Sequence, residues 1–192
     1  MRKQNPPKKK LKKKLPSKIP LKKKTKKKQS SLNKDLAKLG KLLTRHERVV
    51  LLGVGSELRG DDFAGVMLAE RLEKTVRSPL FKALAGHTAP ENFTGEILAH
   101  KPNLVIIVDA AEIKASAGTI KLIDEKDVAG VTFSTHVLPL SVLARYLRHE
   151  APLELVIVGI KPVTLEFEAS VSSAVEIAVN DLACIFEKHF NR

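Results

Sequence analysis

Cysteine, aromatic residues and long apolar runs are scarce in this 192-residue chain, and each shortage excludes a class of protein. The single cysteine, Cys184, permits no internal disulfide and no cysteine-rich metal site. No apolar run reaches the roughly 20 residues that span a membrane, and the lysine-rich start lacks the apolar stretch of a signal peptide. We therefore expect a cytoplasmic protein with no transmembrane segment, in which Cys184 is a partly exposed thiol.

Acidic side chains are absent from residues 1–28, which carry 15 of the 34 lysines and arginines. Four prolines and few sizeable apolar residues accompany them, so this segment cannot bury enough surface to offset the entropy of ordering. The sequence predicts a disordered Lys/Pro-rich tail over residues 1–30. Such a tail is either solvated without a specific role or makes nonspecific contact with a polyanion, either nucleic acid or an anionic membrane.

The sequence beyond residue 28 is close to neutral, with 19 basic and 21 acidic side chains. The high overall charge of +13 therefore belongs to the tail and not to the rest of the protein. About 160 residues are enough for one domain with a substantial core. We expect residues 31–192 to form a single α/β domain and the protein to be a monomer.

Apolar runs alternate with helical patterns through this domain. Strands are predicted at residues 48–54, 80–86, 104–108, 119–123 and 155–158, with helices at 31–44, 61–77, 91–100, 139–147 and 170–189, and a loop at 130–135. The strand at 119–123 follows its predecessor too closely for a helical crossover, so it should be an antiparallel edge strand. The pattern predicts a three-layer α/β/α fold with a mostly parallel five-stranded sheet.

The segment from Leu51 to Val66 joins a strand to a helix through a glycine-containing loop that ends in two adjacent carboxylates. Asp61 is placed to cap the helix, and carboxylates at a helix N-terminus are stabilised as anions. Capping does not explain Asp62, which points in another direction one residue later. In a parallel sheet, ligand sites lie beyond the carboxyl ends of the strands, so partners of Asp62 are expected at the ends of other strands.

Two further side chains are expected at the same edge. Asp109 follows the apolar run 104–108 directly, and His136 precedes the helix that leads to the last strand. Two carboxylates and one imidazole make a mixed oxygen and nitrogen site for zinc, nickel, cobalt or manganese. Each residue alone also fits a plain strand-end acid or loop histidine, and His87 is a fallback ligand.

Two common motifs are excluded. The glycine pair Gly53 and Gly55 would need a third glycine at position 58 to make a dinucleotide-binding loop, and that position is Leu58. The Gly-x-Ser-x-Gly sequence of a serine-hydrolase elbow does not occur.

Five segments together resemble the nickel-iron hydrogenase maturation endopeptidases. They are Gly-Val-Gly-Ser-Glu-Leu-Arg-Gly-Asp-Asp-Phe-Ala-Gly (53–65), Thr-Ala-Pro-Glu-Asn-Phe-Thr-Gly-Glu-Ile (88–97), Val-Ile-Ile-Val-Asp-Ala-Ala-Glu (105–112), Ser-Thr-His-Val-Leu-Pro-Leu (134–140) and Val-Gly-Ile-Lys-Pro (158–162). The resemblance covers residues 49–188 in order. It is strongest to the branch that acts on the large subunit of formate-hydrogenlyase type, group 4, hydrogenases.

The resemblance implies an endopeptidase that removes the C-terminal extension of the hydrogenase large-subunit precursor after nickel insertion. It implies that Asp62, Asp109 and His136 contact the metal and carry the catalytic site, with no separate nucleophile identified. The nickel would be supplied by the substrate, and no organic cofactor is expected. Supporting candidates for capping or substrate contacts are Arg59, Asp61 and Glu91.

Three other functions remain open on the sequence alone. A non-catalytic nickel-dependent assembly scaffold would bind the precursor without shortening it. A conventional metal-dependent aminopeptidase would hold its metal tightly. A nucleic-acid-associated protein would bind through residues 1–28 in a salt-sensitive way.

Overall fold

The computed structural model describes residues 34–123, 132–133 and 140–192. A mixed sheet runs through its middle in the order β2-β1-β3-β6-β4, and β5 pairs with β3 outside this path. The strands are β1 (Val49–Val54), β2 (Phe81–His87), β3 (Leu104–Glu112), β4 (Ile120–Ile123), β5 (Thr132–Phe133) and β6 (Glu154–Ile160).

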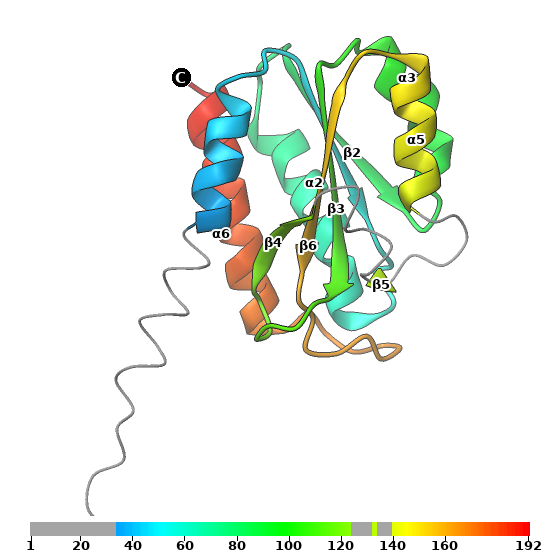
Figure 1. Ribbon diagram of the computed structural model, residues 1–192. Helices are drawn as coiled ribbons and strands as arrows, with labels where there is room; N and C mark the ends of the chain where they lie inside the picture. Colours follow the sequence, from blue (N-terminus) through cyan, green and yellow to red (C-terminus); the bar gives the residue numbers. More distant parts are fainter. Residues whose placement is uncertain (1–33, 124–131, 134–139) are drawn as a thin grey trace, which may run out of the picture.

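Helices cover both faces of the sheet (Figure 1). One face carries the N-terminal helix at residues 34–43, α2 (Ala64–Thr75) and α6 (Ser173–Phe190), and the other carries α3 (Thr94–Ala99) and α5 (Leu140–Glu150). Two short 3-10 turns, η1 (Gly60–Phe63) and η2 (Pro90–Phe93), lead directly into α2 and α3. The expected three-layer α/β/α architecture is confirmed.

Both faces of the central strands are buried, which explains their unbroken apolar sequences. Val49 and Leu51 of β1 pack with α2 and α6, whereas Val50 and Leu52 pack with α3 and α5. Successive side chains of a strand point to opposite faces, so one apolar run supplies both halves of the core. All six residues of β1 are buried.

The strands β2, β1, β3 and β6 are parallel, and β4 pairs with β6 in the antiparallel sense. This confirms both the mostly parallel sheet and the antiparallel edge strand predicted at 119–123. The carboxyl ends of four parallel strands therefore share one edge, which is the lower edge in Figure 1. The loops that follow β1, β2, β3 and β6 meet there.

Two predictions about β3 and its surroundings are wrong. β3 does not stop before Asp109 but continues to Glu112, because β6 pairs with it as far as Ala110 and β5 pairs with it at Ala111 and Glu112. Residues 132–133, expected in a loop, form the partner strand β5. Both differences come from pairing with distant segments, which a local apolar pattern does not record.

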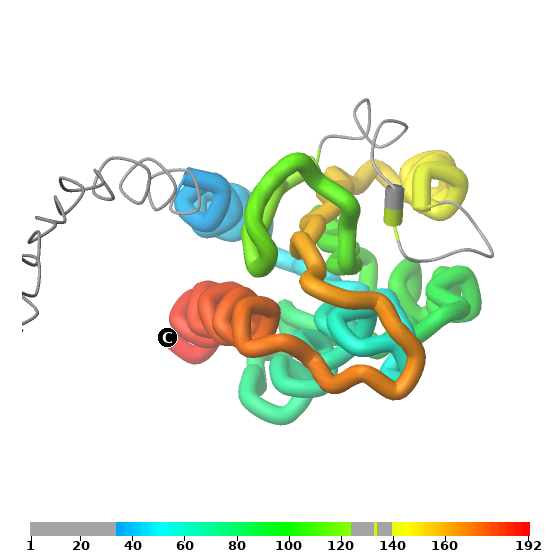
Figure 2. Tube along the Cα trace, turned by 90° about the horizontal axis from the view of Figure 1, so that it is seen from below, coloured from blue at the N-terminus to red at the C-terminus, as the bar shows by residue number. Residues whose placement is uncertain are grey.

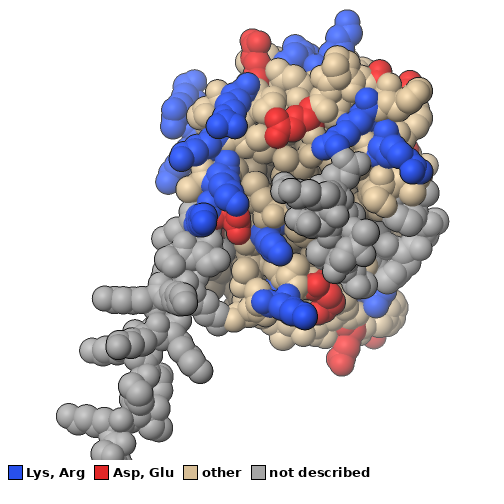
Figure 3. Space-filling view, in the orientation of Figure 1, with Lys and Arg blue, Asp and Glu red and all other residues tan. Residues whose placement is uncertain are grey.

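No helix in the described ranges is long and apolar enough to cross a membrane. Cys184 is exposed and free, as expected. On the face seen in Figure 3, lysine and arginine side chains gather toward the upper left, where the N-terminal helix lies in Figure 1. Lys38, Lys41 and Arg45 of that region line a shallow hollow with Glu154. The predicted tail, residues 1–30, lies outside the described residues, so its polyanion contact stays a prediction.

Candidate functional site

The loop after β1 closes tightly around the backbone of Asp62. Gly55 has a φ of +135°, and a Cβ on it would lie 1.7 Å from the Asp62 carbonyl oxygen. Its N–H donates to the carbonyl of His87 at 3.0 Å, which ties the loop to the end of β2. Only glycine combines this conformation with such close approach. Gly55 thus fixes where Asp62 sits relative to the sheet edge.

The Asp62 carboxylate is buried and only half satisfied. Its side chain belongs to a residue that is 3% exposed, and Oδ2 accepts a hydrogen bond from the Ser56 N–H at 3.0 Å. Oδ1 is buried and has no hydrogen-bond partner within the described part of the chain. A buried carboxylate oxygen without a partner is unfavourable, so such an atom in a folded protein points to a ligand or proton that it receives.

Asp109 lies beside this loop on the neighbouring strand. It is fully buried, and it follows Val108, the last β3 residue that pairs with β1. The start of α2 packs closely against this part of β3, since a Cβ on Gly65 would lie 2.2 Å from the Val108 carbonyl oxygen. Asp61, Asp62 and Asp109 are the buried charged residues of the described chain. The structure therefore places three buried acids in the loop after β1 and on the neighbouring strand β3.

Asp61 joins two distant segments of the chain through hydrogen bonds. The prediction that it caps its own helix is wrong. Neither η1 nor α2 has a side-chain cap hydrogen bond, because Asp61 lies inside the 3-10 turn that precedes α2 and not at its N-cap position. Oδ2 accepts from the N–H groups of Val163 (2.6 Å) and Thr164 (3.3 Å) and from Ser172 Oγ (2.9 Å). Oδ1 accepts from the Ser172 N–H at 2.6 Å. Asp61 thereby holds the segment between β6 and α6 against the loop after β1.

The other two proposed substrate contacts, Arg59 and Glu91, differ in the hydrogen bonds that their side chains form within the described residues. Arg59 is partly buried, and its Nε donates to the Leu165 carbonyl at 3.2 Å, so it also binds the segment after β6. Glu91 lies in η2, and its Oε2 is buried without a hydrogen-bond partner among the described residues. His87, the fallback ligand, is exposed at the end of β2 with a φ of +49°.

His136 lies outside the described residues, so the predicted three-residue metal site stays a prediction. Across 34–123, 132–133 and 140–192, no group of three His, Cys, Asp or Glu side chains is arranged to hold a metal ion. Asp62 and Asp109 are the two members of the predicted site that lie within the described residues. Two carboxylates suit hard or borderline cations, and an imidazole would shift the preference toward nickel or zinc.

Sequence reasoning missed an ion pair at the same edge. The Lys161 ammonium bonds the Glu112 carboxylate, joining the ends of β6 and β3. Glu112 is the last residue of β3, and Lys161 directly follows β6. Because these strands are parallel neighbours, the two residues could have been predicted to lie together. It also missed Ser172 as the main partner of Asp61, for which local sequence offers no signal across 111 residues.

Three residues with shifted pKa values lie on α6 or directly after α3. Burial lowers the pKa of His100 and of His189, and a hydrogen bond from Arg71 lowers the pKa of Glu187. His100 follows α3, and the other two residues belong to α6. Their ionisation therefore bears on helix packing rather than on the acids at the sheet edge.

Several known proteins similar to this chain are described as hydrogenase maturation proteases. A family model described as hydrogenase maturation protease matches residues 66–189. The hydrogenase 3 maturation protease of Escherichia coli is 33% identical over 131 residues, which is 68% of this chain and 83% of that protein. The crystal structure of a nickel-iron hydrogenase maturation protease, HycI, from Thermococcus kodakarensis superposes with a TM-score of 0.74 at 30% identity, covering 80% of this chain and 99% of that one. The hydrogenase maturating endopeptidase HybD from E. coli gives a TM-score of 0.59 at 29% identity, covering 72% and 89%.

Proposed function

Because this chain belongs to the hydrogenase maturation protease family and is therefore a peptidase, we propose that it removes the C-terminal extension of a nickel-iron hydrogenase large-subunit precursor. In this proposal the cut follows nickel insertion, and the inserted nickel is the feature that the enzyme recognises. Nickel arrives with the substrate, and no organic cofactor takes part. Asp62, Asp109 and His136 are the residues that contact the metal.

The half-satisfied carboxylate of Asp62 is the observation that supports this proposal. Oδ2 is oriented by the Ser56 N–H, while buried Oδ1 has no partner among the described residues. An oriented, desolvated carboxylate oxygen binds a cation more strongly than a solvated one, because less water has to be displaced and the local dielectric is low. Fully buried Asp109 lies on the neighbouring strand β3, directly after the last residue that pairs with β1, and supplies the second carboxylate.

The contribution of this edge to cleavage is orientation. Gripping a cation that the precursor already carries would place one peptide bond beside the acids and convert recognition into positioning. A bound cation can also polarise a carbonyl or lower the pKa of a water toward about 7. Asp61 and Arg59 support the site from behind by holding the segment after β6 in place.

Glu91 is the substrate-contacting residue in this proposal. Its buried Oε2 lacks a hydrogen-bond partner in the described ranges, so it can accept one from a peptide N–H or a basic side chain of the precursor tail. The Asp61 carboxylate is already occupied by four hydrogen bonds, which leaves it a positioning residue and not a substrate contact.

Cleavage of nickel-loaded and nickel-free precursor by the purified protein tests the proposal. Intact-mass spectrometry should show a shortened C-terminus only for the loaded precursor, and Asp109→Asn and His136→Ala should abolish the shortening. Equal cutting of both precursors would remove nickel recognition from the proposal. Loss of residues from the N-terminus instead would indicate the aminopeptidase alternative, and binding without any mass change would indicate the assembly scaffold.

A further inference from the structure

Large apolar side chains are exposed on the two loops that flank Asp62. Leu58 is 54% exposed in the loop after β1, and Val163 and Phe167 are 61% and 65% exposed in the segment after β6. We name these three residues the apolar patch. The two other exposed large apolar residues of the described chain, Tyr146 and Ile177, lie on α5 and α6. Exposed apolar side chains that gather in one place mark interaction surfaces, whereas scattered ones do not.

Hydrogen bonds hold the two loops side by side. The Glu168 N–H donates to the Leu58 carbonyl at 2.8 Å, and the Asp61 N–H donates to the Thr164 carbonyl at 3.1 Å. The Asp61 carboxylate accepts from the Val163 N–H at 2.6 Å. Figure 2 shows the segment after β6, in orange, arching beside the cyan turn that begins α2. The apolar patch therefore lies on two loops that hydrogen bonds hold together, and this rigidity reduces the entropy lost on binding a partner.

The apolar patch is continuous with the acid that the proposed function uses. Asp61, whose hydrogen bonds join the two loops, is followed at once by Asp62, whose N–H donates to the Arg59 carbonyl at 3.0 Å within the same loop. Leu58 therefore lies in the same loop as Asp62, four residues before it.

Acidic residues are next to two members of the apolar patch in the sequence. Glu57 precedes Leu58, and Glu166 and Glu168 flank Phe167; all three are exposed, and none of them forms an ion pair within the described ranges. The nearby Arg59 guanidinium is engaged with the Leu165 carbonyl. An apolar centre with an acidic rim is complementary to an apolar segment with basic flanks.

We propose that the apolar patch docks the large-subunit precursor through an apolar segment flanked by basic side chains. This rests on the proposed function for the identity of the partner. Docking beside Asp62 holds the precursor before and during cleavage and contributes to the affinity of the complex. The chemistry stays with the acids of the sheet edge.

Steady-state cleavage of the nickel-loaded precursor by the full-length chain tests this surface. Leu58→Ser and Phe167→Ser should each raise KM about tenfold with little change in kcat, since a buried apolar contact at an interface contributes at this level. The matched controls are Ile177→Ser and Tyr146→Ser, which remove an equally exposed apolar side chain elsewhere. Circular dichroism should show all four variants folded, because each position is exposed. Unchanged KM for Leu58→Ser and Phe167→Ser, or an equal rise in the controls, overturns the proposal.

The acidic rim gives a second measurement. The double variant Glu166→Gln and Glu168→Gln should raise KM a few-fold at low salt and much less at 0.5 M salt, because exposed charges are screened. A peptide with the sequence of residues 1–28 is also basic, but its leucines stand singly and form no apolar segment, so it should compete only weakly. Strong competition would assign the apolar patch to the chain's own tail and overturn the docking of the precursor.

Binding measured without cleavage separates this proposal from the proposed function. The Asp62→Asn protein should bind the precursor, and adding Phe167→Ser to it should weaken that binding about tenfold. If nickel-free precursor is cut as fast as the loaded form, the enzyme does not recognise nickel. The effect of Phe167→Ser on binding would still test whether the apolar patch docks the precursor. If the precursor binds with equal affinity to both proteins, the docking surface fails while nickel recognition stands.

Discussion

The 3-10 turns after β1 and β2 have matching backbone conformations at the residues that flank them, but they serve two different purposes. The residue before η1, Arg59, has φ −130° and ψ 54°, and the residue before η2, Ala89, has φ −133° and ψ 59°. The residue after each turn has a φ of −55° and a ψ within one degree of −45°. Both turns follow a parallel strand, both end in phenylalanine, and both lead into a helix at the same sheet edge.

The two turns differ in what their acids contact. Asp61 and Glu91 occupy the same place, yet Asp61 accepts four hydrogen bonds from the segment after β6, and Glu91 has a buried oxygen with no partner in the described chain. At the next position the first turn carries Asp62 and the second carries Asn92. A turn of this shape places a carboxylate at the sheet edge. Contacts with a neighbouring loop then determine whether that carboxylate holds the fold together or is available to a ligand.

The turns also differ at their first residue. Gly60 has a φ of +52°, which Pro90 at the matching position cannot adopt. A Cβ on Gly60 would lie 3.1 Å from the Thr164 carbonyl oxygen and 3.2 Å from the Ala169 Cβ. The left-handed glycine thus lets the first turn approach the segment after β6 closely enough for Asp61 to bond it. The second turn does without that approach.

Exchanging the acid and the amide between the turns should have the largest effect. Asp62→Asn should lower the rate of precursor cleavage on the order of 100-fold or more, because the amide presents no negative charge to the cation. The fold should survive, since the amide oxygen can still accept from the Ser56 N–H. The matched change Asn92→Asp, at an exposed position, should leave the rate unchanged. Intact-mass time courses measure both, and an Asp62→Asn rate within threefold of wild type contradicts the assigned role.

Removing the structural acid should produce the largest loss of stability. Asp61→Ala breaks four hydrogen bonds and leaves N–H groups of Val163 and Ser172 unpaired, for an expected loss of about 3–4 kcal/mol. In a domain of this size that lowers the Tm by roughly 10 °C. The equivalent change in the second turn, Glu91→Ala, should move the Tm by less than about 3 °C. Differential scanning calorimetry compares them, and equal shifts would mean that the contacts of Asp61 carry no special weight.

Replacing the available acid should separate stability from activity. Glu91→Gln removes a buried charge with one unpaired oxygen, so the free energy of unfolding should stay constant or rise by up to about 1 kcal/mol. The KM for the precursor should rise several-fold if Glu91 accepts a hydrogen bond from it. Urea unfolding and steady-state cleavage measure the two quantities. Glu96→Gln, at an exposed position of α3, is the control, and a destabilised Glu91→Gln protein with unchanged KM would contradict the substrate contact.

Most of the fold could be predicted because its signals are local. The unbroken run in β3 predicts a strand covered on both faces, and Leu104, Ile106 and Val108 do pack on one face while Val105 and Ile107 pack on the other. The short spacing before β4 predicts its antiparallel direction, since no crossover fits. Such features depend on neighbours a few residues apart, and the sequence displays them directly.

The roles of the individual acids could not be predicted, because their partners are distant. Asp61 resembled a helix cap, and its carboxylate instead bonds N–H groups more than 100 residues away. The extension of β3 beyond Asp109 depends in the same way on pairing with β5 and β6. Backbone N–H donors carry no sequence signature. Only the fold shows that Asp61 joins two segments and that Asp62 has an oxygen without a partner among the described residues.

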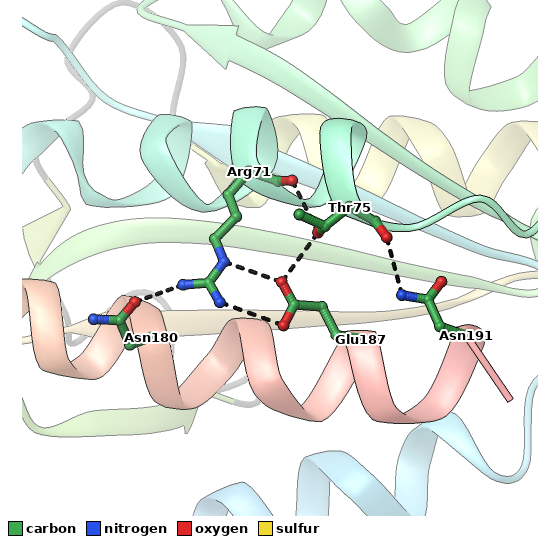
Figure 4. A network of polar contacts seen from close by, with 5 residues as sticks. All are labelled: Arg71, Thr75, Asn180, Glu187 and Asn191. Carbon is green, nitrogen blue, oxygen red and sulfur yellow. Dashed lines mark hydrogen bonds and ion pairs between the residues drawn. The ribbon is translucent and has the colours of Figure 1, made fainter.

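The helix that follows the first turn, α2, is held to α6 near its C-terminal end by a polar network. Arg71 of α2 donates from Nε to Glu187 Oε1 at 3.0 Å and from Nη2 to Oε2 at 3.3 Å, and it also bonds Asn180 (Figure 4). Thr75 Oγ1 donates to Glu187 Oε1 at 3.0 Å. The network joins α2 to α6 and so keeps η1 in line with the segment that precedes α6.

Glu187→Gln should have the smallest of these effects, a loss of about 0.5–1 kcal/mol at pH 7, because the network is near the surface and screened. The hydrogen bond from Arg71 holds the pKa of Glu187 below its ordinary 4.5. The charged form is therefore favoured by folding, and its contribution is present above pH 4.5 and lost as the pH falls through the lowered folded pKa. Urea unfolding at pH 7 and pH 3 should show the wild-type advantage shrinking in acid. The exposed Glu73→Gln on α2 is the control, and an advantage that grows in acid would show that Arg71 does not stabilise the ionised carboxylate.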